Sequence, residues 1–124
     1  MAYLIVFIGA GLGGMLRHGV NVIAARLLGL GFPFGTLFVN VAGGLLMGVL
    51  AEWLLIKGIG NQPLRLFLTT GVLGGFTTFS AFSLDAAVMW QRGHYAMCAG
   101  YAAASVLLSV AALFLGMSAT KALI

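Results

Sequence analysis

Four long apolar runs, separated by three short connections, dominate the pattern of residues along the chain. Each run holds about as many residues as the roughly 20 that a helix needs to cross the hydrocarbon core of a membrane. The connections carry Pro33, Pro63 and Gly93, which are residue types that end helices. The pattern therefore predicts a single all-α membrane domain over residues 1–124, with spans at about residues 3–28, 36–56, 65–90 and 95–119.

Composition places this domain in a lipid bilayer. Hydrophobic residues make up 62% of the 124 and charged residues only 6%, and the mean hydropathy is +1.15. A soluble domain carries about 25% charged residues. The six basic residues are scattered and form no patch, so we expect no nucleic acid partner. The first run lacks a charged leader and is therefore interpreted as a span and not as a cleaved signal.

The distribution of basic residues hardly decides the orientation in the membrane. With four spans, the two termini and the second connection share one side. That side carries Lys57, Arg65 and Lys121, and the other carries Arg26 and Arg92. Two interpretations stay open. Either a small bias or the insertion machinery fixes one orientation, or the chain inserts both ways and pairs with its inverted copy.

Small and polar residues recur every four positions on three of the predicted spans, so each set shares one helical face. Such rows allow close helix packing and hydrogen bonds between helices, but polar groups inside a membrane also mark ion paths. The rows are Gly9, Gly13, Arg17 and Asn21; Thr36, Asn40, Gly44 and Gly48; and Tyr101, Ser105 and Ser109.

The chemistry of these rows suits a small anion. Hydroxyl groups and the Asn40 amide can replace the water shell of an anion and still release it. Phe79 and Phe82, three residues apart, can offer the positive edges of their rings. The only acids, Glu52 and Asp85, lack a basic partner at helical spacing, which argues against an enzyme and against a proton-coupled pump.

The segment GVLGGFTTFSAFS, residues 71–83, is the weakest helical part of the third span. Each glycine costs a helix about 1 kcal/mol relative to alanine. Backbone groups freed inside a membrane must line a cavity or bind an ion. The sequence therefore predicts a third helix broken near its middle, with the glycines at 71, 74 and 75 permitting the break and Thr77 and Thr78 extending it.

Three motifs together resemble the signature segments of the Fluc (CrcB) fluoride channels: GGMLRH (13–18), GTLFVNVAGG (35–44) and GGFTTFSAFS (74–83). The resemblance covers nearly the whole chain. It implies a fluoride-selective channel that exports fluoride passively across the bacterial cytoplasmic membrane and so protects against fluoride toxicity. It also implies an antiparallel, dual-topology homodimer with two pores.

The resemblance also implies roles for individual residues. Arg17 would lie near the aqueous vestibule, and backbone carbonyls of Gly74 and Thr77 from both subunits would hold a structural Na⁺ at the dimer interface. Asp85 stands where many members have glutamate, and Ala81 where many have a hydroxyl. The fluoride pore would be lined by Asn40, Phe79, Ser80, Phe82, Tyr101, Ser105 and Ser109.

Two other classes compete with this interpretation. A small multidrug transporter is also short, four-spanned and sometimes dual-topology, but it needs a carboxylate deep in its first span for proton exchange. Residues 3–28 contain no Asp or Glu. A packing subunit of a larger complex would explain the glycines but not the hydrogen-bond donors on the spans.

Overall fold

The computed structural model describes residues 1–58 and 60–124, and every regular element in them is helical. Four helical stretches are long and apolar enough to cross a membrane, which confirms the predicted all-helical class with four long apolar helices. They are α1 (Ala2–Leu28), α2 (Phe34–Lys57), a composite third stretch (Gln62–Gln91) and α6 (Tyr95–Leu123). The observed bounds lie within four residues of the predicted ones.

The third stretch consists of four successive pieces: α3 (Gln62–Arg65), the π-helix η1 (Leu66–Leu73), α4 (Gly74–Phe76) and α5 (Ser80–Gln91). Residues 77–79 lie outside helix, and Thr77 adopts an extended conformation with φ −87° and ψ 160°. Thr77 and Thr78, which the sequence predicts as part of the break, lie in this segment, whereas Gly71 lies inside η1 and Gly74 begins α4. The helical pattern stops only after the glycines have been passed.

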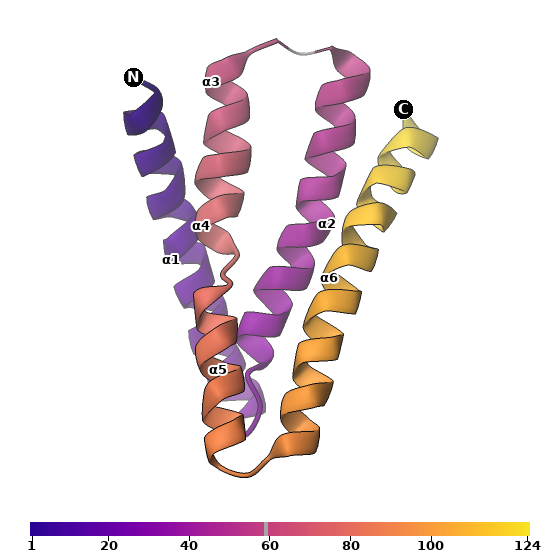
Figure 1. Cartoon of the computed structure of the whole chain (residues 1–124). Coiled ribbons are helices and arrows are strands. Elements are labelled where there is room, and N and C mark those ends of the chain that lie inside the picture. Colours follow the sequence, from indigo (N-terminus) through magenta and orange to yellow (C-terminus); the bar gives the residue numbers. More distant parts are fainter. Residues whose placement is uncertain (59) are drawn as a thin grey trace.

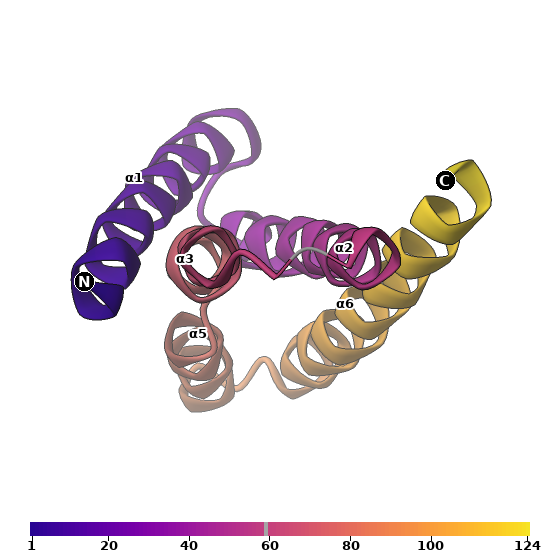
Figure 2. The ribbon, with the colours of Figure 1, turned by 90° about the horizontal axis from the view of Figure 1, so that it is seen from above.

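The four stretches form two closely packed pairs (Figure 1). α1 runs alongside η1 and α4, and α2 runs alongside α6. Viewed from above, the third stretch lies between α1 and α2, and α5 turns away below it (Figure 2). Both termini and the connection that follows α2 lie at the upper end in Figure 1, and the other two connections lie at the lower end. The chain therefore runs four times between the upper and the lower end of the molecule.

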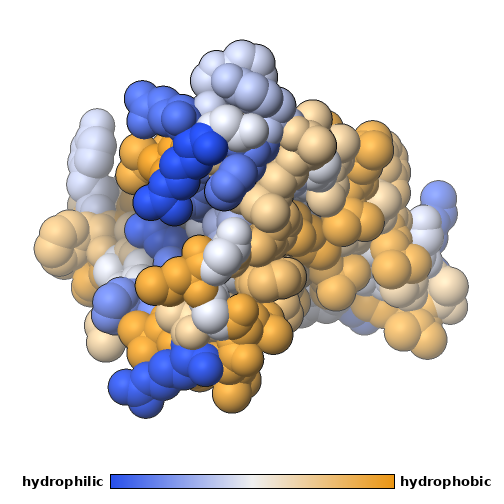
Figure 3. Space-filling model, turned by 90° about the horizontal axis from the view of Figure 1, so that it is seen from below, coloured by the Kyte–Doolittle hydropathy of each residue, from blue (hydrophilic) through white to orange (hydrophobic). Residues whose placement is uncertain are grey.

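The buried interior of the chain is small for its length. Only five hydrophobic side chains are buried among the described residues: Val39, Leu54, Leu73, Met89 and Tyr101. Large apolar side chains are exposed along every span, as lipid contact requires. Viewed from below, most hydrophilic surface lies toward one side, separate hydrophilic residues lie at other edges of the view, and apolar surface covers most of the rest (Figure 3).

Glycines allow both helix pairs to approach closely. A Cβ atom on Gly13 would collide with the carbonyl oxygen of Val72, and one on Gly48 would collide with that of Leu113. Gly13 in the row on α1 and Gly48 in the row on α2 therefore serve close helix packing, which is one of the two interpretations of these rows. Of the other members of these rows, Arg17 and Asn40 contact the interruption between α4 and α5.

We expect Gly48→Ala to destabilise the α2–α6 pair by about 1–3 kcal/mol, because the added methyl meets a backbone oxygen that cannot move aside cheaply. Gly100→Ala on α6 is the matched control, since a Cβ there meets no atom within 4 Å. Thermal unfolding of the purified variants in detergent measures the difference. Equal melting temperatures would show that this contact does not hold the pair together.

Candidate functional site

The site is built around residues 77–79, where the backbone leaves the helix. The Asn40 side chain on α2 meets Thr78 with both ends of its amide. Its Nδ2 donates to the Thr78 carbonyl at 2.9 Å, and its Oδ1 accepts from the Thr78 N–H at 2.8 Å. One asparagine therefore satisfies both backbone groups of a residue that has no helical partners, and one N–H of its amide remains.

This pairing affects Gly74 as well. In an unbroken α-helix the Thr78 N–H would bond to the carbonyl of Gly74, four residues earlier. It bonds to Asn40 instead, so the Gly74 carbonyl loses its helical partner. Thr77 is the first residue after α4, and its carbonyl accepts from Nη1 of Arg17 on α1 at 3.4 Å. Side chains from two other spans thus hold the interruption in place.

A cavity of about 420 Å³ lies beside the interruption, and we call it the serine cavity. It brings together five of the residues that the resemblance assigned to a pore, from α2, the 77–79 segment, α5 and α6: Asn40, Phe79, Phe82, Ser105 and Ser109. Other lining residues are mostly apolar or glycine. A few polar groups therefore face a largely apolar space, which is typical of a selective binding site.

Ser105 and Ser109 are the most informative groups in this cavity. Their hydroxyl oxygens are buried, and within the described part of the chain neither has a hydrogen-bond partner. Most helical serines and threonines avoid this state by bonding to the carbonyl four residues back. Thr69, Ser83 and Thr120 do so here, at 2.7–2.9 Å. The two serine hydroxyls are thus free to donate to a group inside the cavity.

The aromatic residues form a continuous stack next to these hydroxyls. Phe79 is 77% exposed although it lies near the middle of the third stretch. Its ring centroid lies 5.5 Å from that of Phe82, which lies 5.1 Å from that of Tyr101. The planes are tilted by 48° and 47°, so ring edges as well as faces are presented to the surroundings.

Three residues assigned by resemblance lie elsewhere. Arg17 and Ser80 line a neighbouring cavity of about 480 Å³ together with Thr78. Tyr101 is fully buried and lines neither cavity. Its hydroxyl donates to Oδ2 of Asp85 at 3.0 Å, so this hydrogen bond fixes the buried end of the aromatic stack.

The sequence reasoning missed the pairing of Asn40 with Thr78 and that of Tyr101 with Asp85. The first joins residues 38 positions apart and the second residues 16 apart. No spacing rule within one helix reveals such contacts, because they depend on how neighbouring helices are aligned. The polar character of Thr78 within an apolar run was the only available signal.

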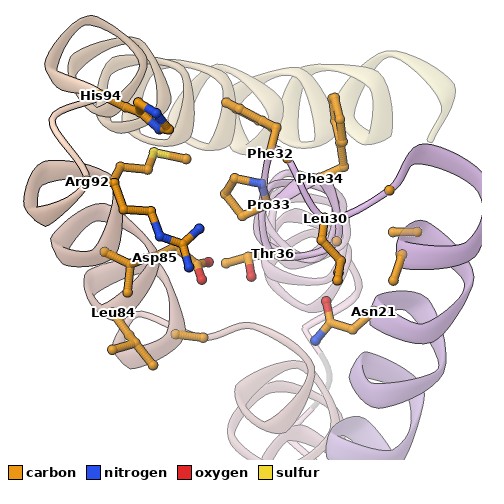
Figure 4. Close-up of a pocket in the computed structure, with 18 residues that line it drawn as sticks. Asn21, Leu30, Phe32, Pro33, Phe34, Thr36, Leu84, Asp85, Arg92 and His94 are labelled. Atoms are coloured by element: carbon orange, nitrogen blue, oxygen red, sulfur yellow. The ribbon is translucent and has the colours of Figure 1, made fainter.

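A third cavity, of about 500 Å³, opens at the lower end of the molecule, and we call it the lower cavity (Figure 4). Its walls come from α1, the connection after it, α2, α5 and the turn before α6. The polar side chains that line it are Asn21, Thr36, Asp85, Arg92 and His94.

Comparison with known proteins places this arrangement in a family. Residues 4–117 match the family model described as CrcB-like protein, Camphor Resistance (CrcB). A protein of Rhodopseudomonas palustris (strain BisB5) named fluoride-specific ion channel FluC is 50% identical over 123 residues, which cover 99% of each chain.

Two further relatives carry the same name. The protein of Granulibacter bethesdensis is 54% identical over 124 residues, covering 100% of this chain and 98% of its own. That of Methylobacterium nodulans is 56% identical over 121 residues, covering 98% and 94%. The resemblance identified from the three motifs is thereby confirmed, and the chain is a multi-pass membrane protein that belongs to the CrcB-like family.

Proposed function

We propose that this protein is a fluoride-selective channel that lets fluoride leave the cell passively across the bacterial cytoplasmic membrane. The observation that carries the proposal is the pair of buried, unpartnered hydroxyls of Ser105 and Ser109 in one cavity with Asn40. The names of the relatives support it. Its test is fluoride efflux from liposomes that contain only this protein.

The lining chemistry suits an anion that must shed water. Hydroxyl groups, one remaining amide N–H of Asn40 and the edges of Phe79 and Phe82 all present partial positive charge. No acidic side chain lines the serine cavity among the described residues. Uncharged donors bind an anion strongly enough for it to enter and weakly enough for it to leave. The protein would thus work without catalytic chemistry.

The competing transporter class has little support. A proton-coupled multidrug transporter needs a carboxylate in its first span, and α1 contains neither Asp nor Glu. The two acids of the chain lie on α2 and α5, where Glu52 is buried and Asp85 bonds to Tyr101. A passive anion path needs no such group.

We also propose that the working unit is an antiparallel homodimer. The serine cavity is open on one side, and Phe79 beside it is largely exposed. A second copy laid against this face would close the cavity and cover the aromatic ring. The near balance of basic residues between the two ends of the molecule permits both orientations in one membrane.

Reporter domains fused to the C-terminus should therefore signal from both sides of the membrane. Several lysines added at one end should fix the orientation and abolish transport when that variant is expressed alone. Coexpression with a variant fixed in the opposite orientation should restore transport. A single strong orientation of the unmodified chain would contradict the dimer proposal.

We further propose that the interruption breaks the third span inside the membrane and forms a joint between the two copies around a structural Na⁺. Backbone carbonyls of Gly74 and Thr77 from both subunits would hold it. The Gly74 carbonyl has lost its helical partner, and the Thr77 carbonyl keeps a lone pair beyond its contact with Arg17. Such carbonyls suit a hard monovalent cation, so the fit is acceptable.

Sodium should then stabilise the dimer. At 100 times its dissociation constant a ligand adds about 2.7 kcal/mol to the stability of the state that binds it. The melting temperature of the purified dimer should be higher in sodium chloride than in the same concentration of N-methylglucamine chloride. Equal melting temperatures, together with an empty twofold axis in an experimental structure determined in sodium, would contradict the ion site.

A further inference from the structure

The lower cavity combines positive and negative side chains near the end of the molecule (Figure 4). Asp85 is the only acidic residue among those that line it, and the only other acid of the chain, Glu52, lies near the opposite end of α2. Arg92 is exposed at the turn after α5, and its guanidinium points toward Asp85 (Figure 4). The two charges therefore face the same space.

The Asp85 carboxylate is held in position at the inner part of this cavity. Its Oδ2 accepts from the Tyr101 hydroxyl at 3.0 Å, and Tyr101 stacks on Phe82 with ring centroids 5.1 Å apart. Phe82 lines the serine cavity. Asp85 in the lower cavity is thus linked through Tyr101 and Phe82 to the wall of the serine cavity, and an unbalanced negative charge there would repel an anion that enters from this end.

We propose that Arg92 is the residue that makes the lower cavity passable for fluoride, because its guanidinium balances the Asp85 carboxylate at the entrance to the path. This inference rests on the proposed function. Arg92 lies outside the three motifs at 13–18, 35–44 and 74–83. The net charge of the Asp85 and Arg92 pair should control the rate at which fluoride enters.

The test is fluoride flux from liposomes of uncharged lipid at about 10 mM ionic strength, where the screening length is about 30 Å. Removing the positive charge with Arg92→Gln leaves the pair at −1 and should lower the flux about threefold to tenfold. Arg92→Lys keeps the charge and should retain the flux. Asp85→Asn keeps an oxygen that accepts from Tyr101 and brings the pair to +1, so it should raise the flux.

The double variant Asp85→Asn with Arg92→Gln restores a neutral pair and should conduct nearly as well as the unmodified chain. Arg26→Gln is the matched control, because Arg26 lies in the last turn of α1, at the same end of the molecule as Arg92, but does not line the lower cavity. It should leave the flux nearly unchanged. At about 0.5 M salt all differences should shrink to less than about twofold, since screening then acts within a few ångströms.

Two results would overturn the inference while leaving the fluoride channel intact. One is an equal effect of Arg92→Gln and Arg26→Gln, which would reduce Arg92 to a general surface charge. The other is a double variant as slow as Arg92→Gln alone, which would show that charge balance is not its task. If the unmodified chain itself carries no fluoride, the proposed function fails instead.

Discussion

Asn40→Asp should abolish fluoride flux, with a loss of at least about three orders of magnitude. A carboxylate about 4 Å from the anion repels it by about 4 kcal/mol at an effective dielectric constant of about 20. The substitution also replaces the amide N–H that donates to the Thr78 carbonyl with an oxygen. The pore and the backbone of the interruption are therefore damaged together.

Asn40→Ala should reduce flux by a smaller factor, about 10-fold to 100-fold, which corresponds to one lost hydrogen bond to a charged group. It should also lower stability, because the Thr78 N–H and carbonyl lose their partner and each buried unpaired group costs about 1–3 kcal/mol. Flux in liposomes and thermal unfolding in detergent are the two measurements.

Asn61→Asp is the matched control for this series. Asn61 precedes α3, and its Oδ1 accepts from the N–H of Leu64 at 3.0 Å, which an aspartate oxygen can also do. It should leave flux and stability unchanged. Normal flux in both Asn40 variants would assign Asn40 to backbone support alone and remove it from the pore.

Ser105→Ala combined with Ser109→Ala should slow fluoride at least about tenfold without lowering the melting temperature. An unpartnered buried hydroxyl costs about 1–3 kcal/mol, so its removal should leave stability unchanged or raise it. A dehydrated anion, by contrast, loses two donors. The opposite signs of the two effects separate a role in the pore from a role in packing.

Ser118→Ala tests the same change on the same helix at an exposed position outside the cavity. It should alter neither flux nor melting temperature. A double serine variant with normal flux and a lower melting temperature would mean that Ser105 and Ser109 only hold α6 against its neighbours.

Much of this fold could be predicted because span formation is a local property. A run of about 20 apolar residues in lipid has few alternatives to a helix, and Pro33 and Gly93 mark where two spans end. The four-residue rows also indicated that Ser105 and Ser109 share one face of their helix, since helical geometry fixes which residues are neighbours. Those residues do line one cavity.

The interruption includes Thr77 and Thr78, as expected from the sequence, but that the glycines before them stay helical could not be predicted, because it depends on contacts between helices. Glycine is a weak helix former, which favoured a break at the glycines, but Gly71 and Gly75 pack directly against Gly9 and Ala10 and remain helical. The interruption occurs at Thr78, where the amide of Asn40 offers the backbone an alternative partner. Tertiary hydrogen bonds thus outweighed local propensity.

The most direct test of the central proposal is passive fluoride efflux from liposomes that contain only the purified chain. Vesicles loaded with potassium fluoride should release fluoride rapidly once a potassium ionophore allows charge balance, and potassium chloride should stay trapped. Release should need no proton gradient. Vesicles that keep their fluoride, or that release it only when a proton gradient drives exchange, would contradict the account of this protein as a fluoride channel.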